Sequence, residues 1–149
     1  MSKTRKMAFM SLFFAIIVFT IIYIENSSVT FRFSLHKELT PKIISVNGTP
    51  TDSFSFERFY GEKPYKDANL TIVIEVLYNH YKPVNGATVT MYGYGDADTN
   101  KTNGKGFTTL HLHVHPFWNR NTPEGYLSMI VTKGKYIEIM DEAVKIMFE

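Results

Sequence analysis

Three histidines alternate with apolar residues in the segment TTLHLHVHPFW, residues 108–118. His111, His113 and His115 are separated by Leu112 and Val114. In a β-strand, successive side chains point to opposite faces, so this pattern places the three imidazoles on one face and the apolar residues on the other. Neutral imidazole is a common ligand of zinc and copper. The segment is therefore a candidate metal site.

The spacing of the histidines limits how such a site would work. Neighbours two apart in a strand lie about 6.6–7 Å apart, so an adjacent pair can share one ion, whereas His111 and His115 lie about 13 Å apart. A complete site needs a further ligand, and the available side chains are His36, His80, Asp96 and Asp98. Because one ion takes only two ligands from this strand, we expect a solvated or partner-facing strand. A zinc or copper site at His111, His113 and His115 is the alternative.

The sequence contains no set of residues typical of a catalytic centre. Cysteine is absent, which excludes disulfides, thiolate metal sites and a cysteine nucleophile. No nucleophile elbow, phosphate-binding loop or HExxH motif occurs. The segment GDADTNKTNGKG begins like a calcium loop, but Lys101 stands where Gly is needed and Phe107 where Glu is needed, so a polar hairpin loop from Gly93 to Gly106 is expected. We predict a non-catalytic protein.

The elements that position the histidines are predicted to be β-strands. Alternation with period two runs through most of the chain after residue 28, which predicts seven to nine strands in two packed sheets. One helical turn is expected near Met140–Val144. The predicted core residues between the sheets are Ile72, Ile74, Val89, Leu112, Val114 and Ile130.

Three segments in order resemble a known family of β-sandwiches. They are KPVNGATVTMYG (82–93), TNGKGFTTLHL (102–112) and TPEGYLSMIV (122–131). Together they are similar to the prealbumin-like, or Ig-like, sandwiches called carboxypeptidase regulatory-like domains, over about Leu70–Phe148. The resemblance implies an all-β sandwich that acts as an accessory module for folding, binding or spacing. It implies no catalytic activity.

An apolar run at the N-terminus predicts a membrane anchor. Met7–Ile24 contains no charged residue and as a helix spans about 27 Å, close to the thickness of a bilayer core. Lys3, Arg5 and Lys6 precede it, which predicts the N-terminus inside and the C-terminal domain outside. No small-residue cleavage pattern follows the run. We expect a single-pass cell-membrane protein with a signal-anchor helix over residues 1–25 and an extracytoplasmic sandwich over residues 26–149.

The charge balance and the glycosylation sequons predict further properties of the chain. Lys3, Arg5 and Lys6 are three of the 16 basic residues, so the rest of the chain, with 14 acidic residues, is close to neutral, and no nucleic-acid partner is expected. Four acceptor sequons predict a glycoprotein. They begin at Asn26, Asn47, Asn69 and Asn100.

Three functions fit these features. The favoured hypothesis is a structural or interaction subunit of a larger membrane or cell-surface assembly, with the lipid bilayer and other subunits as partners. The second is a metal-binding accessory subunit of a membrane enzyme complex, using copper or zinc at the histidine strand. The third is a pilin-like filament subunit, which would combine an apolar N-terminal helix with a β-sandwich head.

Overall fold

The computed structural model describes residues 37–58, 65–117 and 125–149, and these residues form an all-β unit. The predicted anchor, Asn26 and His36 lie outside them. The strands are β1 (Leu39–Val46), β2 (Ser53–Phe56), β3 (Ala68–Tyr78), β4 (Lys82–Pro83), β5 (Thr88–Gly93), β6 (Asp96–Lys101), β7 (Phe107–Val114), β8 (Tyr126–Lys133) and β9 (Tyr136–Phe148). Within the described ranges, no helix is long and apolar enough to cross a membrane.

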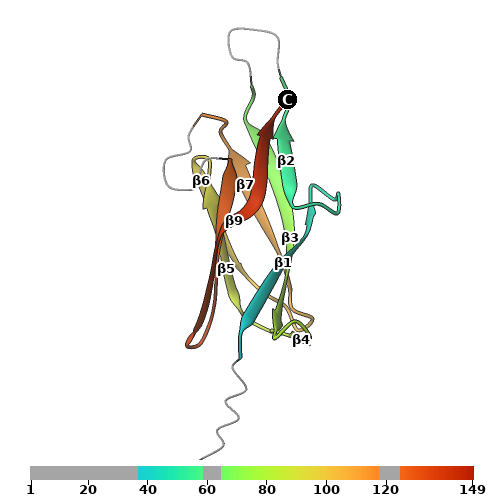
Figure 1. Cartoon of the computed structure of the whole chain (residues 1–149), viewed down its shortest axis with the longest axis vertical. Helices are drawn as coiled ribbons and strands as arrows, with labels where there is room; N and C mark the ends of the chain where they lie inside the picture. Colours follow the sequence, from blue (N-terminus) through green and yellow to red (C-terminus); the bar gives the residue numbers. More distant parts are fainter. Residues whose placement is uncertain (1–36, 59–64, 118–124) are drawn as a thin grey trace, which may run out of the picture. The chain divides into compact units, whose positions relative to one another are not determined.

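The first sheet is built around β3, which pairs with β1 along one edge and with β7 and β4 along the other. All three pairings are antiparallel (Figure 1). The alternation of apolar and polar residues sets the inner face, because Leu70, Ile72, Ile74 and Val76 are fully buried while Asn69 and Thr71 are exposed. The face of β3 that carries Asn69 is the same face of the sheet that carries the histidines of β7.

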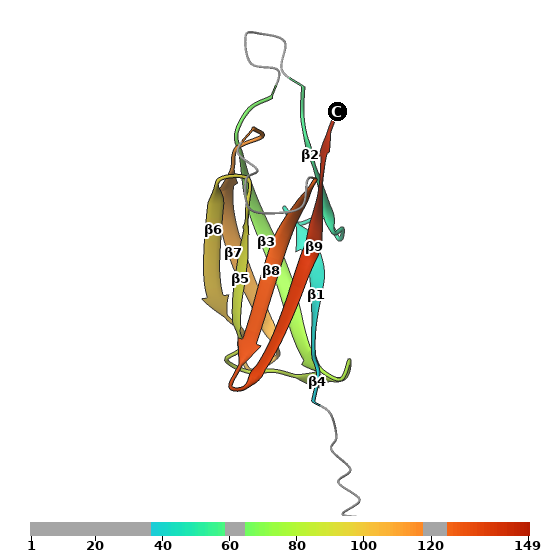
Figure 2. The same cartoon turned by 60° about the vertical axis from the view of Figure 1, so that its left-hand side comes forward.

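The second sheet has the order β2-β9-β8-β5-β6. Its pairings are antiparallel except for β2 and β9, which run parallel from Ser53↔Lys145 to Phe56↔Phe148. Figure 2 shows β9 passing along β8 and then continuing beside β2. The inner face of this sheet contributes buried residues such as Val89, Met91, Met129, Val131 and Val144 to the core.

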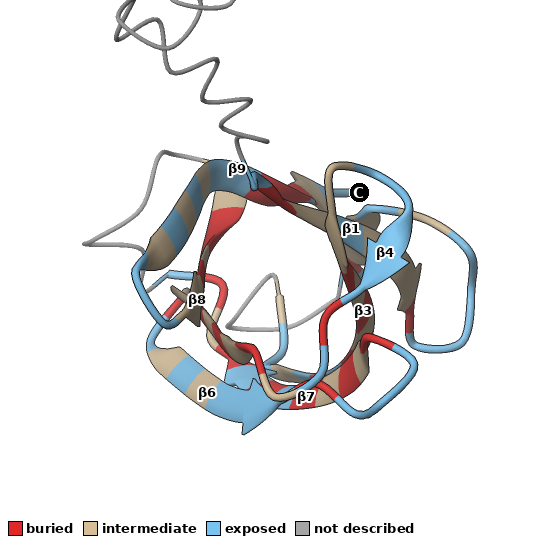
Figure 3. Cartoon of the chain, turned by 90° about the horizontal axis from the view of Figure 1, so that it is seen from below, coloured by how far each residue is buried: buried red, intermediate tan, exposed pale blue. Residues whose placement is uncertain are grey.

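The two sheets curl so that the strands follow one another around a ring, with buried residues inside it (Figure 3). On one side, β6 of the second sheet lies beside β7 of the first, and side chains join them. The Asp98 and Asp96 carboxylates accept hydrogen bonds from the backbone N–H groups of His111 (2.7 Å) and His113 (2.6 Å). The Asn100 side-chain amide donates to the Thr109 carbonyl (3.1 Å). Side chains of β6 thus replace the backbone ladder that would otherwise close the ring.

Several details differ from the expectations drawn from the sequence. The predicted polar loop from Gly93 to Gly106 contains the strand β6, and the segment Met140–Val144 continues β9 without a helical turn. Ile130 is not a core residue: it lies on the outer face of β8, opposite Thr90 and Ile139, while Met129 and Val131 are fully buried. Leu127, Met129 and Val131 form the apolar set of β8, whereas Ile130 alternates with them in the set that contains Ser128 and Thr132, so the apolar character of Ile130 alone was misleading. The other five predicted core residues are buried.

Candidate metal centre

Strand β7 presents its histidines on the outer face of the first sheet. Leu110, Leu112 and Val114 are buried, whereas His111 and His113 are exposed and His115, just beyond the strand, is partly exposed. The predicted division of β7 into an apolar inner face and a histidine-bearing outer face is therefore confirmed. The antiparallel register places Asn69 opposite His113 and Thr71 opposite His111.

A carboxylate from the neighbouring strand joins two of the histidines. Asp67 immediately precedes β3, and the pairing of Ala68 with Val114 brings it beside His115. Its Oδ2 atom lies 2.9 Å from His115 Nδ1 and 3.8 Å from His113 Nε2. Among the described residues, Asp67, His113 and His115 form a group whose ligand atoms all lie within 4.8 Å of one another.

These separations suit one transition-metal ion. Two ligand atoms bound to tetrahedral zinc at about 2.0–2.2 Å lie about 3.3–3.5 Å from each other. The two measured separations from the Asp67 oxygen, 2.9 and 3.8 Å, fall on either side of that value. Small side-chain rotations would therefore bring all three atoms to bonding distance of one ion. Two imidazoles and a carboxylate are a ligand set that zinc and copper accept.

The second ring nitrogen of His113 is already engaged. His113 Nδ1 lies 2.6 Å from Asn69 Oδ1, and because an amide oxygen only accepts hydrogen bonds, the nitrogen must donate. A neutral His113 then has its proton on Nδ1 and a lone pair on Nε2, the atom that faces Asp67. Two acceptors facing each other are unfavourable unless a cation or a proton lies between them. Metal-binding histidines in proteins are commonly oriented in this way by a hydrogen bond from the other ring nitrogen.

The other candidate ligands take no part in this group. His111 Nδ1 lies 3.3 Å from Thr71 Oγ1, and His111 is not part of the group formed by Asp67, His113 and His115. Asp96 and Asp98 are engaged by the backbone of β7. His80 follows the far end of β3, and His36 lies outside the described residues. The geometry therefore selects the pair His113–His115, whose ring centroids are 4.9 Å apart, and leaves His111 out.

Asp67 was not among the ligands suggested by the sequence. It stands outside every alternating segment, and only the pairing of β3 with β7 reveals that it lies beside His115. The useful signal was the segment DANLTIVIEV itself, because an acidic residue at the start of a long strand reaches the end of an antiparallel neighbour. Without knowledge of which strands are neighbours, that signal could not be used.

Three of the four sequon asparagines lie within the described residues, and all three are exposed. Asn47 occupies a turn with a positive φ of 50°, and its side chain bonds to the backbone of β3. Asn100 lies in β6 rather than in the expected loop, and Asn69 lies beside His113. The exposure of these side chains leaves glycosylation as a prediction for each of them.

No protein-family model matches the chain, and it has no match among curated proteins or solved structures. The functional argument therefore rests on the geometry of the chain itself.

Proposed function

We propose that this protein is a membrane-anchored, extracytoplasmic β-sandwich module that binds one zinc or copper ion at Asp67, His113 and His115. In this proposal the module is a non-catalytic subunit of a larger membrane or cell-surface assembly. The bound metal ion forms part of the surface through which the module contacts that assembly. The copper or zinc accessory role, rather than a solvated strand, thus becomes the preferred reading of the histidines.

One observation carries the proposal: the acceptor atom of His113 faces a carboxylate oxygen while its other nitrogen donates to Asn69. A cation at this point satisfies all three ligand atoms at once. The side chains of His113, His115 and Asp67 are 51%, 33% and 50% exposed, so an ion held by them keeps at least one coordination position open to the exterior. A water molecule or a side chain of a partner subunit can occupy that position.

Other features support the membrane location and the class of module that we propose for the site. The uncharged run Met7–Ile24 and its basic flank support a single membrane anchor with the sandwich outside. The resemblance of residues 70–148 to carboxypeptidase regulatory-like domains supports an Ig-like, prealbumin-like accessory module. The two curled sheets of the described unit, which are antiparallel except for the pairing of β2 with β9, are compatible with that class.

The test is a metal titration of the full chain, purified in mild detergent and stripped of metal with a chelator. We expect calorimetry to give one Zn²⁺ or Cu²⁺ per chain, and we expect the ion to raise the melting temperature by mass action. His113→Ala and Asp67→Ala should each abolish the tight binding. His111→Ala is the matched control, because His111 shares the strand and the face but not the group of ligands.

Two results would contradict the proposal. If neither metal binds with a stoichiometry near one, Asp67, His113 and His115 form a group of polar side chains on the sheet surface and not a metal site. If His111→Ala weakens binding as much as His113→Ala does, the strand binds metal without the geometry described above.

A further inference from the structure

One end of the described unit is rich in lysine. It is the end where β1, β5 and β9 begin and where β3, β6 and β8 finish, as the pairings Leu39↔Tyr78, Thr88↔Lys101, Thr88↔Thr132 and Lys133↔Tyr136 require. The lysines of this basic end are Lys37, Lys82, Lys101, Lys105, Lys133 and Lys135. Glu38 and Glu138 are acidic residues at the same end, so six lysines face two carboxylates and positive charge predominates. Figure 3 looks onto this end and shows exposed residues in several of its loops.

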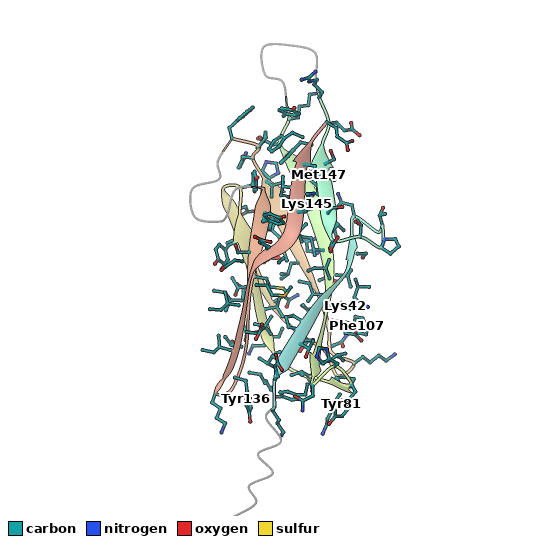
Figure 4. All side chains as sticks on the ribbon, in the orientation of Figure 1. Lys42, Tyr81, Phe107, Tyr136, Lys145 and Met147 are labelled. Atoms are coloured by element: carbon teal, nitrogen blue, oxygen red, sulfur yellow. The ribbon has the colours of Figure 1, made fainter. Side chains whose placement is uncertain are left out.

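Aromatic and aliphatic side chains accompany the lysines. Tyr81 is 72% exposed and Ile137 is 64% exposed. Figure 4 shows Tyr81 and Tyr136 at this same end. Tyrosine and lysine together are typical of membrane–water interfaces, where the ring lies among the headgroups and the ammonium group reaches phosphate.

The lysines and tyrosines also contact one another. Lys37 Nζ lies 5.5 Å from the centre of the Tyr78 ring, and Lys135 Nζ lies 5.6 Å from that of Tyr136. The two rings meet edge to face at 6.0 Å. These contacts link the start of β1 to the β8–β9 hairpin, so the basic end is a connected surface rather than separate loops.

The chain enters the unit at this end. Lys37, the first described residue, precedes β1, and twelve residues (25–36) separate it from the apolar run Met7–Ile24. Even fully extended, twelve residues reach no more than about 43 Å. If Met7–Ile24 spans the membrane, the connection therefore limits the start of β1 to within about 43 Å of the bilayer surface.

From the charge, the aromatic residues and the point of entry, we infer that the basic end docks on the phosphate groups of anionic lipids in the membrane that holds the anchor. This inference rests on the anchor of the proposed function but not on the metal site. Docking would hold the sandwich against the bilayer and present the opposite end to a partner. Attraction between lysines and an anionic lipid surface falls off within a Debye length, so docking depends on ionic strength.

The absence of cysteine makes a direct test practical, because one introduced cysteine carries the only label. Asn85→Cys, exposed in the loop before β5, would carry an environment-sensitive fluorophore at the basic end. Ala97→Cys, exposed on β6 towards the other end, is the control position. The full chain is reconstituted into vesicles of phosphatidylcholine, with or without phosphatidylglycerol. We expect a blue shift and protection from an aqueous quencher at position 85 only, in anionic vesicles only, with loss of both effects at high salt.

Charge reversal provides the decisive comparison. Lys133→Glu with Lys135→Glu should abolish the shift at position 85. Lys66→Glu with Lys145→Glu changes the net charge equally but away from the basic end, because Lys66 precedes the start of β3 and Lys145 lies near the end of β9, and should leave the shift unchanged. Equal signals in neutral and anionic vesicles, or the same response to both double variants, would overturn the inference.

Three further outcomes are separable. Loss of the shift on adding inorganic phosphate at constant ionic strength would overturn lipid docking in favour of a small-anion site. A shift caused by a DNA oligonucleotide, with none caused by anionic vesicles, would overturn it in favour of a nucleic-acid surface. Failure of the chain to sediment with the vesicles would contradict the proposed membrane anchor. Sedimentation without a shift at position 85 would contradict the docking of the basic end alone.

Discussion

At the scale of single residues, the candidate metal centre depends on a residue that would not touch the ion. Asn69 accepts a hydrogen bond from His113 Nδ1 and thereby directs Nε2 towards Asp67. Thr71, two residues along the same strand and on the same face, stands in the equivalent place beside His111. The two neighbours therefore offer a comparison between a positioning residue and an ordinary contact.

We expect Asn69→Ala to weaken Zn²⁺ binding by about 10–100-fold, the usual cost of losing a partner that orients a metal-binding histidine. Thr71→Ala should leave the affinity unchanged. Calorimetric titration of the two variants in detergent measures both values. Equal losses in the two variants would show that the outer face of the sheet, and not the orientation of His113, determines affinity.

A second prediction concerns the core. Ile74 is fully buried in β3, and Ile74→Ala should lower the free energy of unfolding by about 2–5 kcal/mol because it removes three methylene-sized groups and leaves a cavity. Ile139→Ala is the control, since Ile139 lies exposed on β9, and a change within about 0.5 kcal/mol is expected there. Urea denaturation measures both. A loss below about 1 kcal/mol for Ile74→Ala would contradict its place in the core.

At the scale of elements, the ring is closed by a row of polar side chains on β6. Asp96 and Asp98 are half-buried and accept hydrogen bonds from the backbone of β7, while Ala97 and Thr99, which alternate with them, are exposed. A hydrogen bond to a charged acceptor is stronger than one between neutral groups. Because of this row, the backbone N–H groups of His111 and His113 on the facing edge of β7 already have hydrogen-bond acceptors.

We predict that Asp98→Ala lowers the free energy of unfolding by about 1–2 kcal/mol, because the N–H of His111 loses a charged acceptor in a seam that water partly reaches. Asp98→Asn keeps an acceptor oxygen and should recover part of that loss. Hydrogen exchange at the His111 amide should accelerate in the alanine variant. An unchanged exchange rate would mean that the seam is closed by packing and not by the carboxylates.

Strands β6 and β7 together show which features of the fold could be predicted from the sequence and which could not. Alternation in residues 110–115 predicted both faces of β7, because Leu110, Leu112 and Val114 are apolar and the three residues that alternate with them are histidines. Asp96, Asp98 and Asn100 looked like loop residues because their short polar side chains favour turns and disfavour strands. They occupy a strand because the backbone of β7 supplies their partners, and partners that are 13 and 17 residues away leave no trace in local composition. Asp67 was missed for the same reason.

At the scale of the whole molecule, we expect the apolar run Met7–Ile24 to lie in lipid and the described unit to lie in water. We expect the chain to remain in the membrane pellet after carbonate extraction, because Met7–Ile24 carries no charge over about the thickness of a bilayer core. Ile17→Arg places a charge in the middle of the run and should move the chain towards the supernatant. Release of a soluble species that begins after Glu25 would instead identify a cleaved signal.

The parallel pairing of β2 with the end of β9 also determines when the domain can be completed. Residues 53–56 pair with residues 145–148, and β9 lies between β2 and β8 in the sheet. At a synthesis rate of about 5–20 residues per second, β2 waits roughly 5–20 s for its partner strand. Contacts between residues so far apart in sequence also slow folding itself. During that interval Phe54 and Phe56 lack the strand that covers them in the finished domain. Their apolar rings therefore remain without this cover on the nascent chain until Phe148 has been synthesised.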